Sequence, residues 1–202
     1  MKLLQHKSTW FIGLIGFLLG ALLILGIRFV TYHPDKPHFH ANFAVYINGQ
    51  REQFNSPFYY EEVAACDVDG NMTPKQRTHM HDMKPDVVHV HDYAVTWGHF
   101  FQNIGWNVGE GLLQTNDKIY TTDGQNKVTF ILNGQKVRDI ATEKIGDKDR
   151  LLINFGDQDQ ATLQKESASV PTSAEQYDRN KDPASCSGSG APTMKERWEH
   201  LF

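Results

Sequence analysis

The chain lacks the excess of positive charge that a nucleic-acid-binding surface needs. Its 202 residues hold 20 Lys and Arg against 24 Asp and Glu, a formal net charge of −4. No basic tract interleaved with aromatic residues occurs either. Because nucleic-acid binding requires a positive face, we expect no nucleic-acid partner.

Common catalytic motifs are missing as well. The sequence contains no G-x-S-x-G, no P-loop and no Rossmann glycine pattern. The segment DVDGN at residues 67–71 begins like a calcium loop, but Gly stands at its fourth rather than its sixth position, and Thr78 occupies the twelfth. An EF-hand is therefore excluded, and no separate catalytic constellation is visible.

A long hydrophobic run is present near the N-terminus. Every residue from Trp10 to Ile27 is apolar or Gly, and about 18 such residues can span a membrane as a helix. The run exceeds the roughly 7–15 residues of a signal-peptide core, and no A-x-A site follows it. The sequence therefore predicts an uncleaved membrane anchor over residues 9–31, with a buried core helix as the alternative.

Charged residues on the two sides of this run indicate its orientation. Lys2 and Lys7 precede it, whereas Arg28 and Lys36 follow it and Asp35 partly offsets them. The positive-inside rule then favours a cytoplasmic N-terminus. We expect a single-pass protein of the cell membrane whose C-terminal domain lies outside the cytoplasm.

Cysteine is scarce, with only Cys66 and Cys186 in the chain. In an oxidising compartment an even count suggests a disulfide. A Cys66–Cys186 bond would close a long loop and add on the order of 4–5 kcal/mol in the chain-entropy model. Two thiols, or one thiolate metal ligand, are the alternatives.

The part after the hydrophobic run has the pattern of a hairpin-built β domain. Residues 39–47 alternate between apolar and polar, which is the period of a half-buried strand. Asn-Gly pairs at 48–49 and 133–134 are strong hairpin signals. The Asp-Gly pair at 123–124 is expected to make a third hairpin between the strands on its two sides.

One helix interrupts the expected strands. In TWGHFFQNIG, Thr96 can begin the helix and Gly105 can end it. The apolar residues at 97, 100, 101 and 104 form one stripe, which predicts core packing. The expected fold class is mainly β (α+β): an antiparallel, hairpin-built domain with one short buried helix, preceded by a single N-terminal transmembrane helix.

The composition changes after about Gly156 and becomes rich in Ser, Pro, Asp and Gly. We expect a loosely structured polar tail that wraps the domain. Its last residues could form a short amphipathic helix through Met194, Trp198 and Leu201, packed on the domain or on the membrane surface. The expected organisation is a cytoplasmic N-terminus at 1–8, the anchor at 9–31, a His-rich β domain at 32–156 and the tail at 157–202.

Histidine is the residue whose pattern carries chemistry. Three His-x-His pairs occur, at His38 and His40, His79 and His81, and His89 and His91. Residues two apart in a strand point to the same side, so the members of each pair share a face.

The Lys-Pro-Asp sequence at 84–86 predicts a turn between the last two pairs. A loop centred there places His81 opposite His89 and His79 opposite His91, with Met80 on the core side.

Such a cluster of imidazoles favours a transition-metal site, with zinc or copper as the expected ion. A set of surface histidines or a pH sensor is the alternative. Asp82 and Asp92 each follow a pair and could hold an imidazole from the second coordination shell or act as ligands. His99 is a further candidate for a ligand or a base, although it lies opposite the apolar stripe of the predicted helix.

The order of these motifs is similar to that of a known group of proteins. An anchor, then HFHANFAVYINGQ, HMHD, VVHVHDYAVTWGHFF and a tail with DPASCSG together cover most of residues 10–187. They resemble membrane-anchored, histidine-rich prokaryotic proteins without an established activity. Two better-known patterns fit less well. HMHDMK lacks the Asp and the last His of the metallo-β-lactamase-like H-x-H-x-D-H pattern, and HVHDY has Tyr where the histidine triad has its third His.

Two kinds of function follow from these patterns. The first is a membrane-anchored, extracytoplasmic protein that binds zinc or copper for storage, delivery or sensing, with a membrane-protein partner. The second is a metal-dependent hydrolase or oxygenase that uses the same histidines, with Asp82, Asp92 or His99 as its base. A metal that only staples the hairpins is a third, structural alternative.

Overall fold

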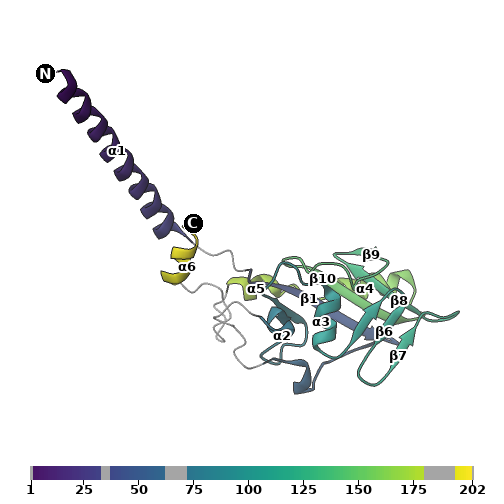
Figure 1. The fold of residues 1–202 in the computed structure, drawn as a ribbon. Coiled ribbons are helices and arrows are strands. Elements are labelled where there is room, and N and C mark those ends of the chain that lie inside the picture. Colours follow the sequence, from purple (N-terminus) through teal and green to yellow (C-terminus); the bar gives the residue numbers. More distant parts are fainter. Residues whose placement is uncertain (1, 33–36, 62–71, 180–193, 202) are drawn as a thin grey trace. The chain divides into compact units, whose positions relative to one another are not determined.

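The computed structural model of the chain describes residues 2–32, 37–61, 72–179 and 194–201 (Figure 1). It divides into two compact units, one made of Met1–Asp35 with Ser189–Phe202 and the other of Lys36–Gly188. The predicted class is confirmed: an N-terminal apolar helix, sheets built mostly from antiparallel strands, and a few short helices. Cys66 and Cys186 lie outside the described residues, so their pairing stays a prediction.

The first unit contains helix α1 (Lys2–Thr31) and helix α6 (Met194–Glu199). The segment Trp10–Thr31 of α1 is 22 residues long and apolar enough to cross a membrane, a property that anchors and signal sequences share. Its large apolar side chains are exposed in the structure, as a bilayer-facing helix requires.

The second unit is organised around a seven-stranded sheet. Its strand order is β3-β4-β1-β10-β8-β9, and β2 also pairs with β1. Only β1 and β10 run parallel; the other neighbours are antiparallel. The bounds are β1 Phe39–Ile47, β2 Gln50–Arg51, β3 Thr78–His79, β4 Val87–Val90, β8 Lys127–Leu132, β9 Gln135–Val137 and β10 Arg150–Gly156.

Both Asn-Gly turns form the predicted hairpins. Asn48 and Gly49 have φ of 51° and 76°, and Asn133 and Gly134 have 52° and 78°. Positive φ at both central residues is what a type I′ turn requires. The turns connect β1 to β2 and β8 to β9.

The hairpin predicted at Asp123-Gly124 is wrong. A turn does form there, because Asp123 Oδ1 accepts hydrogen bonds from the backbone N–H groups of Gln125 and Asn126 at 2.8 and 2.7 Å. However, β7 pairs with β6 in a separate sheet, whereas β8 pairs with β10. That sheet has three strands, β5 Asn107–Gly109, β6 Leu112–Gln114 and β7 Ile119–Thr121.

The main core lies on one face of the large sheet. Helix α3 (Trp97–Asn103) fills it with Trp97, Phe100 and Phe101, all 0% exposed, as its apolar stripe predicts. Phe43 of β1 packs against Phe100 with ring centroids 5.1 Å apart. A smaller core on the other face contains Ala44, Ile131, Leu152, Leu163 and Val170.

Two helices occupy the segment that was expected to be a loose tail. α4 (Gln160–Ala168) contributes Leu163 to the smaller core, and α5 (Ala174–Arg179) packs on β1. The start of α5 is tied to the sheet by the buried side chain of Asn42, which accepts from Ala174 N–H at 2.9 Å and donates to Ser173 Oγ at 3.0 Å. Two further short helices, η1 (Pro57–Tyr59) and α2 (Pro74–Arg77), lie in the connection to β3.

Candidate metal centre

Three neighbouring strands at one edge of the large sheet bring the histidines together. His40 of β1 lies opposite His89 of β4, and His89 lies opposite His79 of β3. His38 directly precedes β1, His91 directly follows β4, and His81 lies two positions after the end of β3. Five of these six side chains are buried, with exposed fractions between 1% and 7% (His40, His79, His81, His89 and His91).

The two faces of these strands have separate roles. Met80, Val88 and Val90 belong to the main core and are 0% exposed. The histidines alternate with them, so they point to the other side of the sheet. There α5 covers the sheet, and the Tyr177 ring lies 5.8 Å from His40 and 6.3 Å from His89.

The predicted register of the histidine hairpin is wrong by two residues. His79, not His81, lies opposite His89. The turn begins at His81, whose carbonyl accepts from Lys84 N–H at 3.1 Å, and Asp82 and Met83 have φ of 55° and 51°. Because a shift of two residues preserves the alternation of faces, the histidines still share one side.

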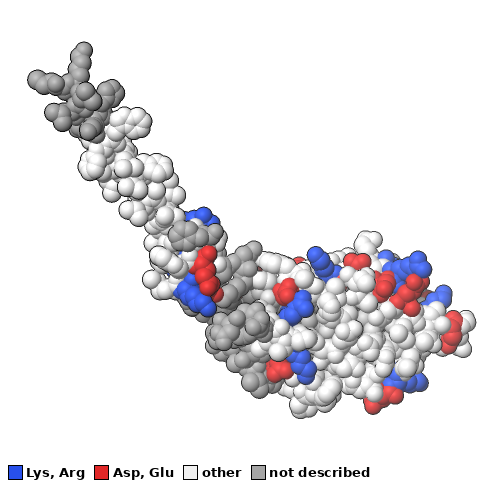
Figure 2. Space-filling view, viewed as in Figure 1, with Lys and Arg blue, Asp and Glu red and all other residues white. Residues whose placement is uncertain are grey.

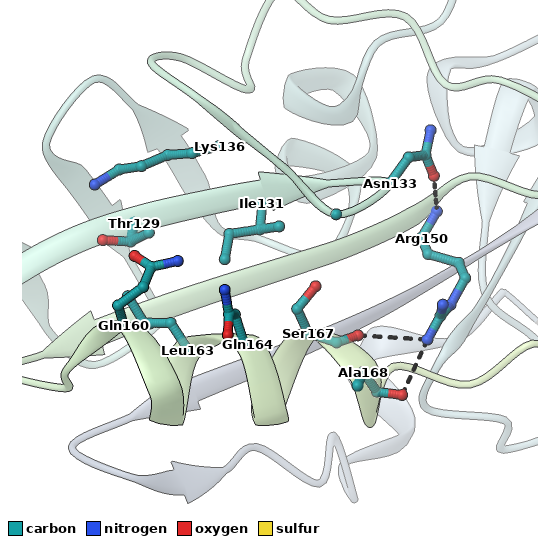
Figure 3. Close-up of a pocket in the computed structure, with 11 residues that line it drawn as sticks. Thr129, Ile131, Asn133, Lys136, Arg150, Gln160, Leu163, Gln164, Ser167 and Ala168 are labelled. Carbon is teal, nitrogen blue, oxygen red and sulfur yellow. Dashed lines mark hydrogen bonds between the residues drawn. The ribbon is translucent and has the colours of Figure 1, made fainter.

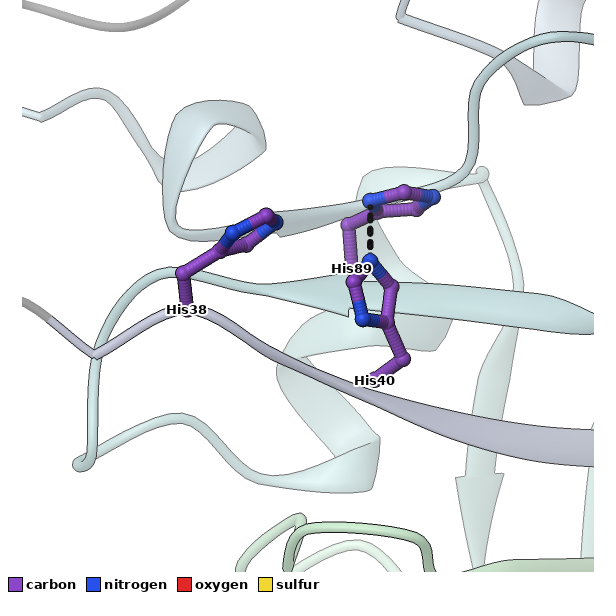
Figure 4. A group of neighbouring side chains, drawn as sticks. All are labelled: His38, His40 and His89. Atoms are coloured by element: carbon purple, nitrogen blue, oxygen red, sulfur yellow. Dashed lines mark hydrogen bonds between the residues drawn. The ribbon is translucent and has the colours of Figure 1, made fainter. Parts of the chain in front are cut away.

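The centre of the cluster is a trio formed by His38, His40 and His89 (Figure 4). His40 Nε2 lies 2.9 Å from His89 Nδ1. One ring nitrogen from each residue can be chosen so that the three atoms lie within 4.8 Å of one another, close enough to hold a metal ion. Within the described part of the chain, these three histidines form a group of potential metal ligands.

The other three imidazoles contact this trio. His81 Nε2 lies 3.0 Å from His89 Nδ1, and the two ring centroids are 3.6 Å apart. His91 stacks on His38 at 4.8 Å, and His79 stacks on His89 at 5.7 Å. The six rings therefore form one continuous cluster around the trio.

Oxygen atoms outside the cluster orient two of the rings. His40 Nδ1 lies 2.7 Å from Asp178 Oδ1, and His79 Nδ1 lies 2.9 Å from the carbonyl oxygen of Lys75. A carbonyl or a carboxylate can only accept, so each Nδ1 carries the hydrogen and each Nε2 carries the lone pair. Histidine ligands of metals are held in the same way by outer acceptors.

The arrangement around His89 favours a cation. His40 Nε2 points its lone pair towards His89 Nδ1, and His81 Nε2 also lies at hydrogen-bond distance from that same atom. A carboxylate oxygen of Asp82 lies 3.0 Å from His81 Nδ1. If His89 Nδ1 carries a hydrogen, it cannot donate well to both nitrogens; if it carries a lone pair, it faces the lone pair of His40 Nε2. A metal ion binds such converging lone pairs directly.

Burial keeps the central imidazole neutral. Desolvation strongly lowers the pKa of His89, and the neighbouring His40, His81, His79 and His38 lower it further. Burial by itself raises the pKa of Asp178, but the hydrogen bonds from His40 and Lys148 hold it below its usual range. The cluster thus pairs a neutral central imidazole, the form that binds metal ions, with a charged carboxylate at its edge.

Acidification should destabilise the metal-free protein. The pKa of His89 is lower in the folded than in the unfolded chain, so below about pH 6.5 the unfolded chain takes up a proton that the folded chain refuses. The free energy of unfolding then falls with falling pH, by about 1.4 kcal/mol per unit for one histidine. Urea denaturation of the full chain in detergent at pH 7.5, 6.5 and 5.5, followed by Trp fluorescence, measures the slope. In His89→Gln the slope should correspond to about one proton fewer, because this residue no longer titrates on unfolding. An unchanged slope would contradict the lowered pKa of His89.

Two of the predicted accessory residues are engaged elsewhere. Asp92 forms an ion pair with Arg77 at 2.7 Å and accepts from Ala94 N–H. His99 is exposed and takes part in the capping box of α3, where its Nδ1 accepts from Thr96 N–H at 3.1 Å. Asp82 does contact the cluster, through His81.

Sequence reasoning missed the residues that support the cluster from outside. Asp178 contacts His40, and Lys148 Nζ lies 3.2 Å from the second carboxylate oxygen of Asp178. Asp178 lies 138 positions from His40 in the chain, on a helix that the polar composition did not predict. No local signal in the sequence marks this contact.

A cavity of about 330 Å³ lies elsewhere, between α4 and the strands β8 and β10 (Figure 3). Arg150 borders it and donates to the carbonyl oxygens of Ser167 and Ala168 at 3.4 and 3.1 Å, which stabilises the C-terminal end of α4. None of the described residues that line it is a histidine, a cysteine or a carboxylate. It therefore offers no metal ligands of these types, and the histidine cluster is the stronger candidate site.

No protein-family model, no curated protein and no solved structure matches this chain.

Proposed function

We propose that this protein is a membrane-anchored, extracytoplasmic transition-metal-binding protein that takes zinc or copper for storage, delivery or sensing. The observation that carries the proposal is the buried trio of His38, His40 and His89, with its ring nitrogens within 4.8 Å. Membership of the histidine-rich prokaryotic group described above stays a prediction.

The donor atoms favour this class of metal. The trio offers only imidazole nitrogens, and the three rings around it are also histidines. Imidazole suits zinc and copper, whereas calcium and magnesium prefer oxygen ligands. The nearest carboxylates, Asp178 and Asp82, contact the outward Nδ1 atoms of His40 and His81.

The membrane part of the proposal is supported by α1. Its apolar segment Trp10–Thr31 has a length suited to a bilayer. The lysines before it favour a cytoplasmic N-terminus, which would place the histidine cluster on the outer side. A partner that donates or receives the ion would then be another membrane protein.

A metal-dependent enzyme is the second candidate, and one observation favours it. Three protein ligands leave a position of a tetrahedral ion open, as in catalytic zinc sites. Against it, His40 and His89 are only 1% and 2% exposed, and α5 covers the sheet beside them. Asp92 and His99, two of the expected bases, are also engaged in other contacts. Binding is therefore the function that the geometry supports better.

Metal content of the purified protein tests the proposal. The full chain, extracted from membranes without chelator, should carry at least one equivalent of zinc or copper by elemental analysis. The His40→Gln, His89→Gln variant should carry almost none, because it loses two of the trio. A metal-free wild-type protein that takes up neither ion on titration would contradict the proposal.

A further inference from the structure

The C-terminal helix α6 is bonded to the last turn of α1. Arg197 Nη1 donates to the carbonyl oxygens of Phe29 at 2.6 Å and Val30 at 2.7 Å. The guanidinium also lies over the Phe29 ring, 5.9 Å from its centroid. His200 stacks on Tyr32 with ring centroids 4.2 Å apart. Residues about 170 positions apart in the chain thus form one small interface.

This interface satisfies a chemical need at the end of α1. The last carbonyl groups of a helix have no partner within the helix, and they form the negative end of its dipole. Arg197 supplies both hydrogen bonds and positive charge to them. Such carbonyls are costly where water is scarce, so the contact matters most if the end of α1 lies at a bilayer.

The position along α1 agrees with such a location. A segment of 22 residues, Trp10–Thr31, rises about 33 Å in a helix, which is close to the thickness of the hydrocarbon core. Phe29 and Val30 lie in its last turn, and Arg197 binds there. α6 is therefore held at the level where the headgroup region would begin.

The side chains of α6 suit that environment. Trp198 and Met194 are 63% and 72% exposed. Trp is enriched at membrane interfaces. The charges of α6 balance, with two basic and two acidic side chains in MKERWE, so the apolar and aromatic side chains are what favour a lipid surface. Figure 2 shows charged side chains of both signs around α6 and the adjoining end of α1, whereas the part of α1 that is drawn in white carries none.

We propose that α6 is a second membrane contact, which lies in the bilayer interface on the side where α1 ends. Trp198 and Met194 would enter the headgroup region, while Arg197 caps α1. The partner is a lipid surface, and the inference rests on the membrane anchor in the proposed function. The unit of Lys36–Gly188 would then be followed, as well as preceded, by a membrane-attached segment.

Quenching of Trp fluorescence by brominated lipids tests this in the full chain. The chain has four Trp residues, and Trp97 and Trp106 are only 0% and 1% exposed, so lipid should not quench them. In a Trp10→Phe variant reconstituted into phosphatidylcholine–phosphatidylglycerol nanodiscs, lipids brominated near the top of the acyl chain should quench Trp198. Adding Trp198→Phe should remove that quenching.

Two matched variants separate this proposal from the anchor itself. In Trp198→Phe alone, quenching of Trp10 reports insertion of α1. Quenching of Trp10 without quenching of Trp198 would overturn the α6 contact and leave the anchor standing, and quenching of neither would overturn both. Arg197→Gln in the Trp10→Phe background should weaken quenching of Trp198, and unchanged quenching would overturn the capping role of Arg197.

Discussion

Replacing His89 with glutamine is expected to abolish high-affinity metal binding. The His89 ring contacts both His40 and His81 at about hydrogen-bond distance, 2.9 and 3.0 Å. Its loss removes one ligand and also the ring around which the others are arranged. The affinity should therefore fall by more than the roughly 10–100-fold that loss of an outer partner costs. Isothermal titration of zinc and of copper into the detergent-solubilised chain measures the effect.

His99→Gln is the matched control for this experiment. His99 is exposed on α3, which packs on the core face of the sheet, opposite the face that carries the histidine cluster. Gln at that position can keep the capping box, so stability should change little. Metal affinity equal to wild type is expected for His99→Gln, and the same affinity in His89→Gln would show that the trio is not the binding site. The urea unfolding transitions of both variants are compared with that of the wild type. A wild-type transition in His89→Gln would show that the variant is folded and has lost only a metal ligand.

The predicted register placed His81 directly opposite His89. In the observed register, His81 no longer lies directly opposite His89, although their rings touch. His40→Gln should therefore weaken binding more than His81→Gln, because His40 belongs to the trio and His81 does not. The reverse order would point to an ion seated between His81 and His89.

Asp178→Asn is expected to weaken metal binding by about 10–100-fold, although Asp178 is outside the trio. Its carboxylate holds His40 Nδ1 at 2.7 Å, which keeps the Nε2 lone pair directed at the site. The negative charge also makes the imidazole a better donor to a cation. An asparagine can accept the same hydrogen bond, but it carries no charge and can turn its NH₂ group towards the ring instead.

The tautomer of His40 separates this role from a structural one. In the metal-free wild type, nitrogen-edited NMR of the imidazole should show Nδ1 protonated, and Asp178→Asn should give a mixture of tautomers. Asp147→Asn is the control, because Asp147 contacts Lys148 at 2.6 Å, as Asp178 does at 3.2 Å. If Asp178→Asn leaves the His40 tautomer unchanged, Asp178 does not orient that ring, whether or not the protein binds a metal.

Local features of this chain were predictable because the forces that create them act over a few residues. The alternation of apolar residues in 39–47 predicts a half-buried strand, and a strand, β1, does form there. It is buried on both faces from residue 40 to 45, because α5 packs against it. The Asn-Gly pairs make tight turns because Asn and Gly tolerate positive φ. The stripe of Trp97, Phe100 and Phe101 required a core, and α3 supplies it.

The sequence by itself determined that the histidines share one face, because alternation in strands survives a shift of two residues. Only the tertiary structure decided which imidazoles converge. The turn at His81 places His79 opposite His89, and pairing with β1 adds His40 and His38 from about 50 positions away. The same holds for α5 and Asp178, whose contacts with β1 depend on how the whole chain packs. Contacts between residues so far apart follow from the summed packing of a fold, and no short pattern encodes them.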